Sequence, residues 1–401
     1  MKNGRRLFLL LCLSTSVFAL PAQAQDVPPA VQAMLDSMAR QTNTKPSYAS
    51  LEQASDGTVK IGALTLALPA AAGNPGMNVV IGEVYLAGIA DQGEGLYQIG
   101  TAKFSNVKVD LSDPGFSATV TMPEGIAEDW YIKSLGAGAT AQDQVRAAMT
   151  VARKMSSGPM SISAMGQTIT VDGYEQTFEG DPRSGAGTYV LKMNNLAIPE
   201  HAVALADQGG MLKQLGYGAL NFDVSSTSKL SIEGANLGLD FDLALSGRDI
   251  GTMTFAGGAA GIPAEAYAEL QRAGSSGQQP DFNAVMPQIQ NITINGASFR
   301  FDDASVTKRL MPMMAAMQGM DETTMVNTAG AMVQMGLMQL QSPQFAEQAA
   351  NAVNAYLKDP KSITIAAKPS APVKVSDMMT LDPAKPQDAI SKLGVTVSAN
   401  D

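Results

Sequence analysis

The residue types that most often carry catalysis are scarce in this chain. His201 is the single histidine and Cys12 the single cysteine. A Ser-His-Asp triad, a Cys-His pair or a zinc site needs converging histidine or cysteine side chains. His201 follows Pro199 and Glu200 at the start of an apparent helix, where we expect a surface or capping role. The sequence therefore predicts no catalytic residue, no metal ligand set and no cofactor.

Paired carboxylates are the next candidates for chemistry. Asp240 and Asp242 alternate with Leu239, Phe241 and Leu243, so both acids share one face of a strand. Acids on a wet strand face usually provide solvation or protect a sheet from aggregation. We expect that role here, with a calcium site or an acid/base pair as the alternative.

The glycine-rich run from Gly180 to Gly187 is a further candidate, in this case for a phosphate-binding loop. It lacks the Lys-Ser/Thr ending and the strand-to-helix context of a phosphate-binding loop. Its proline and arginine favour a solvated hairpin loop. The pair Asp302-Asp303 likewise lacks the glycine and the spaced acids of an EF-hand calcium loop.

Methionine is the compositional anomaly, and nine methionines crowd residues 311–338. Thioethers are soft ligands suited to Cu(I), but they also fill gaps in cores and make adaptable apolar surfaces. A step of three residues falls about 60° short of a helical turn, so four such methionines do not line one face. Core packing, an apolar ligand surface and Cu(I) handling are the alternatives. The ligand surface would be formed by Met311, Met314, Met317, Met332, Met335 and Met338.

The elements that must position these residues are mostly strands. Between Leu220 and Phe255, apolar residues recur at every second position, and glycine-containing turns interrupt the pattern near Gly234 and Gly247. Side chains alternate across a strand, so this pattern predicts a three-stranded antiparallel meander with one buried face and one wet face.

The remaining segments extend or cover this sheet. We expect an α+β fold with a long, mostly antiparallel curved sheet, amphipathic helices on one face and a methionine-rich helical region near the C-terminus. A short helix is expected over Val27–Arg40, another over Gln142–Met155, and a flexible linker over Ala273–Pro280. The expected segments are a signal peptide (1–24), an N-terminal helix and lead-in (25–57), the meander with inserted helices (58–303), the methionine-rich helices (304–358) and C-terminal strands with a short helix (359–401).

The first residues resemble an export signal. Lys2, Arg5 and Arg6 precede an apolar run, and Ala22-Gln23-Ala24 offers small residues where a signal peptidase cleaves. We expect cleavage after about Ala24 and a periplasmic product, with a lipidated Cys12 as the alternative. Losing three positive charges changes the formal charge from −10 to −13. An acidic chain repels phosphate backbones, so nucleic acid is not an expected partner. No later apolar run approaches the length of a transmembrane helix.

The strand texture is similar to that of AsmA-like and related uncharacterised envelope proteins of Gram-negative bacteria. The segments that carry this resemblance, which spans about half of the chain, are Val107–Leu111, Leu237–Leu243, Asp359–Ile365 and Leu393–Val397, with Pro369 and Pro372 between the last two. The resemblance implies lipid handling through a sheet groove lined by apolar residues. Such proteins usually keep an N-terminal membrane anchor, whereas the signal here looks cleavable.

These observations favour a non-enzymatic periplasmic protein that binds an apolar ligand, such as a lipid, or an envelope protein. The ligand would lie between the sheet and the methionine-rich helices. A structural or assembly factor that acts through protein–protein contacts is the main alternative, and methionine-based Cu(I) handling is a further one.

Overall fold

The computed structural model describes residues 27–42, 44–68, 76–113, 116–136, 138–149, 151–207, 209–269 and 287–401. Two compact units are present: unit 1 is Met1–Gly185 with Ala268–Pro280, and unit 2 is Ala186–Tyr267 with Asp281–Asp401. The expected signal peptide and the expected linker at Ala273–Pro280 lie outside the described residues. Within those residues, 17 strands pair in antiparallel fashion beside several helices, which confirms the α+β class.

Unit 1 is built on a meander of long strands. Each neighbouring pair from β1 to β5 is antiparallel, and β5 then pairs with both β6 and β7. The pairing of β6 with β9 and of β7 with β8 completes the sheet of this unit. Its strands are β1 (Ser50–Gln53), β2 (Val59–Leu68), β3 (Gly76–Asp91), β4 (Leu96–Asp113), β5 (Phe116–Lys133), β6 (Val151–Ser157), β7 (Met160–Ala164), β8 (Gln167–Val171) and β9 (Gly173–Gly180).

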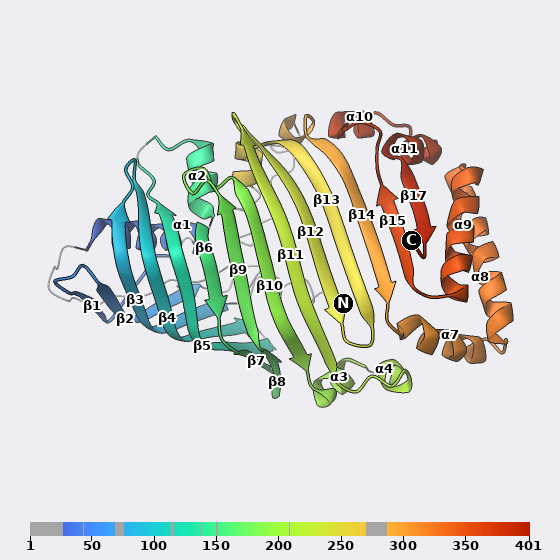
Figure 1. Cartoon of the computed structure of the whole chain (residues 1–401), viewed down its shortest axis with the longest axis horizontal. Coiled ribbons are helices and arrows are strands. Elements are labelled where there is room, and N and C mark those ends of the chain that lie inside the picture. The colour runs from blue at the N-terminus through green and yellow to red at the C-terminus, as the bar shows by residue number, and fades with distance from the viewer. Residues whose placement is uncertain are drawn as a thin grey trace. The chain divides into compact units, whose positions relative to one another are not determined.

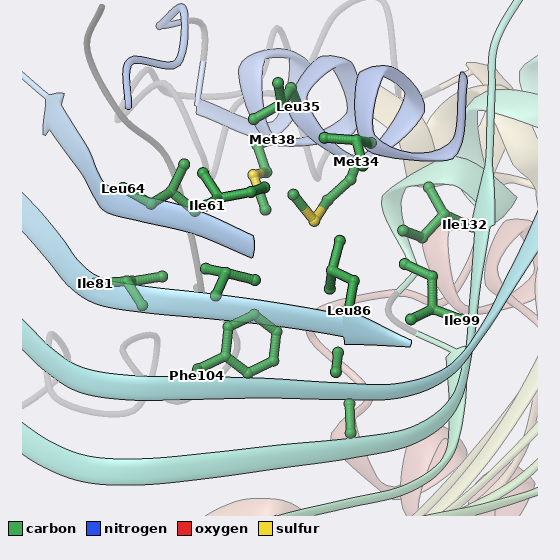
Figure 2. Packing of buried hydrophobic residues seen from close by; sticks show 14 of the residues in the cluster. Met34, Leu35, Met38, Ile61, Leu64, Ile81, Leu86, Ile99, Phe104 and Ile132 are labelled. Atoms are coloured by element: carbon green, nitrogen blue, oxygen red, sulfur yellow. The ribbon is translucent and has the colours of Figure 1, made fainter. Parts of the chain in front are cut away.

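Helix α1 (Pro29–Thr42) covers the first strands of unit 1 and forms the core with them. Proline suits the first helical position because its missing N–H has no intrahelical partner there. Helix α1 confirms the helix expected over Val27–Arg40. Its apolar residues recur at helical spacing and are buried, namely Val31, Met34, Leu35 and Met38. In Figure 2, Met34 and Met38 point from α1 toward side chains of the sheet such as Leu86.

One helix of unit 1 ends earlier than expected. The spacing predicted helix from Gln142 to Met155, but α2 spans Ala141–Ala148 and residues 151–157 form β6. The apolar residues Ala152 and Met155 fit a helical stripe, but Ala152 pairs with Trp130 of β5 and Met155 with Ala127. Pairing with a neighbouring strand overrides the weak local preference for helix.

Residues Ile162 to Tyr174 alternate in polarity throughout, but they belong to three strands rather than one. Met165 and Gly166 both have positive φ and connect β7 to β8 as a tight hairpin. A turn with two positive φ values matches the right-handed twist of the flanking strands.

Unit 2 contains the predicted meander. Strands β10 (Gly187–Ile198), β11 (Leu220–Glu233), β12 (Asn236–Gly247), β13 (Gly251–Pro263) and β14 (Thr293–Asp303) pair in chain order (Figure 1). The sheet continues through β15 (Ser362–Ala367), which pairs with β14 and with β17 (Val395–Ala399). The two-residue strand β16 (Val373–Lys374) pairs with the start of β14. Short helices α3 (Glu200–Ala206) and α4 (Met211–Gln214) connect β10 to β11, and residues 264–269 are helical after β13.

The methionine-rich region is helical, as the sequence predicts. It forms α7 (Val306–Met317), α8 (Glu322–Leu337), the short 3₁₀ helix η3 (Met338–Leu340) and α9 (Pro343–Lys358). The helices are interrupted near Gly319 and near Pro343, where glycine and proline disfavour helix continuation. Helices α10 (Val375–Met379) and α11 (Pro386–Leu393) precede β17.

Candidate functional site

One face of the unit 2 sheet is apolar. Directly opposed residues of antiparallel strands lie on the same face, so the pairing register defines it. One row runs from Leu243 through Phe255, Phe299 and Ile365 to Val397. The neighbouring rows contain Leu245, Met253, Phe301 and Ile363 on one side, and Phe241, Gly257, Ala297 and Ala367 on the other. These residues are called the apolar face below.

The middle of the apolar face is open to solvent. The side chains of Phe241 and Phe255 are each 41% exposed, and that of Ile365 is 48% exposed. The rings of Phe255 and Phe299 lie 4.9 Å apart between centroids and are tilted by 46°. Contiguous exposed apolar surface is unusual in a soluble protein and often marks a binding site. This differs from the sequence-based expectation, in which the alternating strands bury one face.

The opposite face of the same strands is polar. Asp240 and Asp242 lie there, opposite Lys229 and Thr227 of β11, as their alternation with leucine predicts. Further along the sheet the same side carries Thr254, Arg300, Thr364 and Ser398 in register. The aromatic apolar face and the charged polar face are therefore the two sides of one sheet.

Helix α9 covers one end of the apolar face. Ala349 and Ala352 of α9 form a buried cluster with Val397 of β17. Ile363 of β15 packs against this cluster, as do Val333 and Leu337 of α8. Small alanine side chains bring the helix close to the strand, so both helices attach to the C-terminal edge of the sheet and leave Phe255 and Ile365 exposed.

The six methionines of the expected ligand surface lie in different environments. Met311 is buried in α7 with 5% exposure, and Met314 is half-buried. Met317 at the end of α7 is 76% exposed. The remaining three are exposed on α8 and at the start of η3, namely Met332 at 60%, Met335 at 68% and Met338 at 64%. None of these six methionines belongs to the cluster in which Ala349 and Ala352 of α9 pack against Val397 of β17.

The other sequence candidates occupy structural positions. His201 is exposed in α3. The run that starts at Gly180 is a loop, as predicted, because β9 ends at that residue and β10 begins at Gly187. Asp181 accepts hydrogen bonds from the backbone N–H groups of Arg183 and Ser184, so those donors are satisfied within the loop. Asp303 accepts a hydrogen bond from the N–H of Thr307 in the first turn of α7.

A charged cluster secures the end of the chain on the polar face. Arg300 donates two hydrogen bonds to the carboxylate of Asp302 and contacts the carboxylate of Asp401 at 3.1 Å. The hydrogen bonds to Asp302 raise the pKa of the Arg300 guanidinium. A hydrogen bond from Ser398 Oγ and the nearby Arg300 hold the pKa of Asp401 below its ordinary value. This geometry is that of a structural ion-pair network, because Asp302 and Asp401 both pair with the same guanidinium, that of Arg300.

Metal-binding clusters and membrane-crossing helices are both absent from the residues that the structure describes. No group of three or more His, Cys, Asp or Glu side chains is arranged to hold a metal ion in that part of the chain. Among the helices that the structure describes, none is long and apolar enough to cross a membrane.

The residues that sequence reasoning missed are the aromatic ones of the apolar face. Phe241 and Phe255 lie in the strands expected between Leu220 and Phe255, but one face of those strands was expected to be buried. The available signal was the aromatic character itself, since Phe255 and Phe299 pair directly across β13 and β14. Their exposure depends on which elements cover the sheet, and a single sequence does not contain that information.

Comparison with known proteins adds little about function. A family described only as "Uncharacterized protein" matches residues 244–400, from the end of β12 to β17. No curated protein matches the chain. The matched segment includes Phe255, Phe299 and Ile365 together with all the methionine-rich helices, and its description names no activity, ligand or envelope protein.

Proposed function

We propose that this protein is a non-enzymatic binder of lipids, and that acyl chains lie on the apolar face of unit 2. The observation that carries the proposal is the row of half-exposed apolar side chains centred on Phe255 and Ile365. Removing such surface from water contributes about 25 cal/mol per Å². An extended hydrocarbon chain can cover several strands at once, which a compact polar metabolite cannot.

The remaining features fit this role. The apolar face presents carbon side chains without a charged group in its central row, so it offers no specific partner to a polar headgroup. A headgroup would remain in solvent beside the sheet. The export signal expected at residues 1–24 places the protein in the periplasm in this proposal, where lipids must cross an aqueous space. The resemblance to AsmA-like proteins supports the same class of ligand.

Binding of a fluorescent fatty acid tests the proposal. We expect dansyl-undecanoic acid to bind the full mature chain with a gain in fluorescence. Replacing Phe241→Gln and Phe255→Gln together should weaken binding at least about tenfold, which corresponds to ~1.4 kcal/mol. The matched control, Phe241→Leu with Phe255→Leu, keeps the surface apolar and should retain binding. The circular dichroism spectra of both variants should match that of the unchanged protein, because the two substituted side chains are half-exposed.

Native mass spectrometry of gently purified protein identifies what the chain carries. A recurring adduct that extracts into organic solvent and has the mass of a phospholipid supports the lipid proposal. Equal binding by the glutamine and leucine variants would refute the assignment to the apolar face. Recovery of a stoichiometric protein partner without lipid would favour the assembly-factor alternative instead.

A further inference from the structure

Methionine dominates the exposed apolar surface of this protein. Twelve large hydrophobic side chains are exposed in the described part of the chain, and eight of them are methionine. Three of these eight, Met332, Met335 and Met338, follow one another along α8 and η3. Residues three apart on a helix are surface neighbours, with Cβ atoms about 5–6 Å apart. The three thioethers therefore form one continuous patch, called the α8 methionine patch below.

The patch lies on the side of α8 that faces away from the rest of unit 2. The inward side carries Val326, Gly330, Val333 and Leu337, which are buried or half-buried. At about 100° per residue, Met335 lies opposite the centre of that inward side. Met332 and Met338 lie about 60° to either side of it. The sulfur atoms are consequently reached from solvent without any movement of the helix.

The attachment of α8 does not depend on the patch. Gly330 lies so close to Asn354 of α9 that a Cβ atom at this position would clash with the side-chain amide group. Val333 and Leu337 pack against the cluster formed by Ala349, Ala352 and Val397. A chemical change at Met335 therefore leaves these contacts in place. By contrast, Met34 is fully buried and Met311 is 5% exposed, so their thioethers are shielded within packed cores.

Oxidation of the three methionines would strongly change the polarity of this part of α8. No charged residue occurs between positions 323 and 346, a span that contains most of α8 and the start of α9. Sulfoxide formation turns a flexible apolar side chain into a polar one with a strong acceptor oxygen. Three such changes would replace an apolar patch with a polar one on this uncharged stretch of the chain.

We propose that Met332, Met335 and Met338 form a reversible oxidation site, at which two-electron oxidants such as hydrogen peroxide convert thioethers to sulfoxides while the fold stays intact. Each thioether sulfur donates two electrons and accepts one oxygen atom from the peroxide. The O–O bond breaks, and the second oxygen leaves as water. Methionine sulfoxide reductases reverse the step: two thiols supply two electrons and two protons and become a disulfide, the sulfur returns to the thioether state, and the sulfoxide oxygen leaves as water.

Peptide mapping after graded peroxide treatment of the full chain tests this proposal. We expect each methionine of the patch to gain one oxygen at a rate within about threefold of that in the urea-unfolded chain, and Met317 to react similarly. Met34 and Met311 should react at least about tenfold more slowly than in the unfolded chain. Reductase treatment should remove the added oxygen from the patch.

A second measurement shows whether the fold persists. The far-ultraviolet circular dichroism spectrum and the melting temperature should remain close to those of untreated protein after the patch is oxidised. Retention on a hydrophobic-interaction column should fall in the same sample. The triple variant Met332→Leu, Met335→Leu and Met338→Leu keeps the patch apolar and removes its three thioethers, while the five other exposed methionines remain. Its retention should therefore fall less than that of the unchanged protein, and the difference between the two measures the patch. Protection of the patch equal to that of Met311, or loss of helical signal on its oxidation, would overturn the proposal.

Discussion

Phe255 shows how one residue can satisfy a strand pattern and still face solvent. Its neighbours alternate in polarity, its ring lies against Phe299, and its register is fixed by pairing with Leu243. Burial, however, requires a second layer above the ring, and its 41% exposure shows that this layer is incomplete. Because an aromatic ring carries much apolar area, a few such residues suffice to create a surface that attracts hydrocarbon.

Asp321 offers a test at the scale of a single residue. Its carboxylate caps α8 by accepting hydrogen bonds from the backbone N–H and the hydroxyl of Thr324. These bonds favour the ionised form and lower the pKa of Asp321 below its ordinary value of 3.8. A carboxyl group whose pKa is lowered by folding stabilises the folded state above its unfolded pKa. That contribution is lost as the pH falls through the lower, folded-state pKa.

We therefore expect the Asp321 carboxyl carbon to titrate below 3.8 in an NMR pH series. Protection of the amides in the first turn of α8, measured relative to their intrinsic exchange rates at each pH, should fall over the same pH range because the cap is lost there. The variant Thr324→Val removes the hydroxyl donor and should move the midpoint of Asp321 upward. An unshifted midpoint in both proteins would show that the cap does not form in solution.

Residue-level expectations succeeded where the reason was local. The stripe of α1 could be predicted because Val31, Met34, Leu35 and Met38 recur at helical spacing after proline. Ala152 could not be placed correctly, because the same spacing suits a helix and its strand state depends on Trp130, which is distant in sequence. Whether Phe241 is exposed and whether Met311 is buried likewise depend on which other elements pack over these residues. Thus the residues of the candidate site could be identified as apolar, but not as accessible.

Among the elements, α9 determines how the methionine-rich region joins the sheet. Its inward side is a seam of alanines, with Ala346, Ala349, Ala350 and Ala352 all buried. Small side chains allow a helix axis to approach its neighbours closely, and close packing tolerates little added volume. The helix breaks could be predicted because glycine and proline mark them, whereas the order of layers, with α9 against β17 and α8 against α9, could not.

Enlarging this seam should destabilise unit 2. We expect Ala352→Leu to lower the free energy of unfolding by about 1–3 kcal/mol, because Ala352 lies in the cluster with Val397 and the added carbons have no free volume. Urea denaturation followed by circular dichroism gives the difference. The control Gln348→Leu places the same side chain at an exposed position of α9 and should change the free energy by less than about 0.5 kcal/mol. Equal effects of the two variants would contradict the seam.

At the scale of the whole molecule, charge and cysteine content define what holds the chain together. The formal charge of −10 works against compaction through self-repulsion, although it favours solubility. A chain with a single cysteine cannot form an internal disulfide. Each compact unit must therefore obtain its stability from burial of apolar side chains. In unit 1 that burial is concentrated where α1 lies on the long strands of the meander (Figure 2).

Substitution of Met34 measures how much the burial of apolar side chains beneath α1 stabilises unit 1. Its side chain is fully buried in the cluster that joins α1 to the sheet of unit 1. Truncation to alanine removes the contacts of the thioether and leaves a cavity, so Met34→Ala should reduce the free energy of unfolding by about 2–5 kcal/mol. Met379→Ala is the matched control, because Met379 is 52% exposed and its truncation should cost less than about 0.5 kcal/mol. Urea denaturation measures both, and a reducing agent should leave each curve unchanged because no disulfide contributes. If both truncations had the same small effect on the free energy of unfolding, the packing of α1 would not be a source of stability. Some other interaction would then have to offset the charge repulsion within the acidic chain.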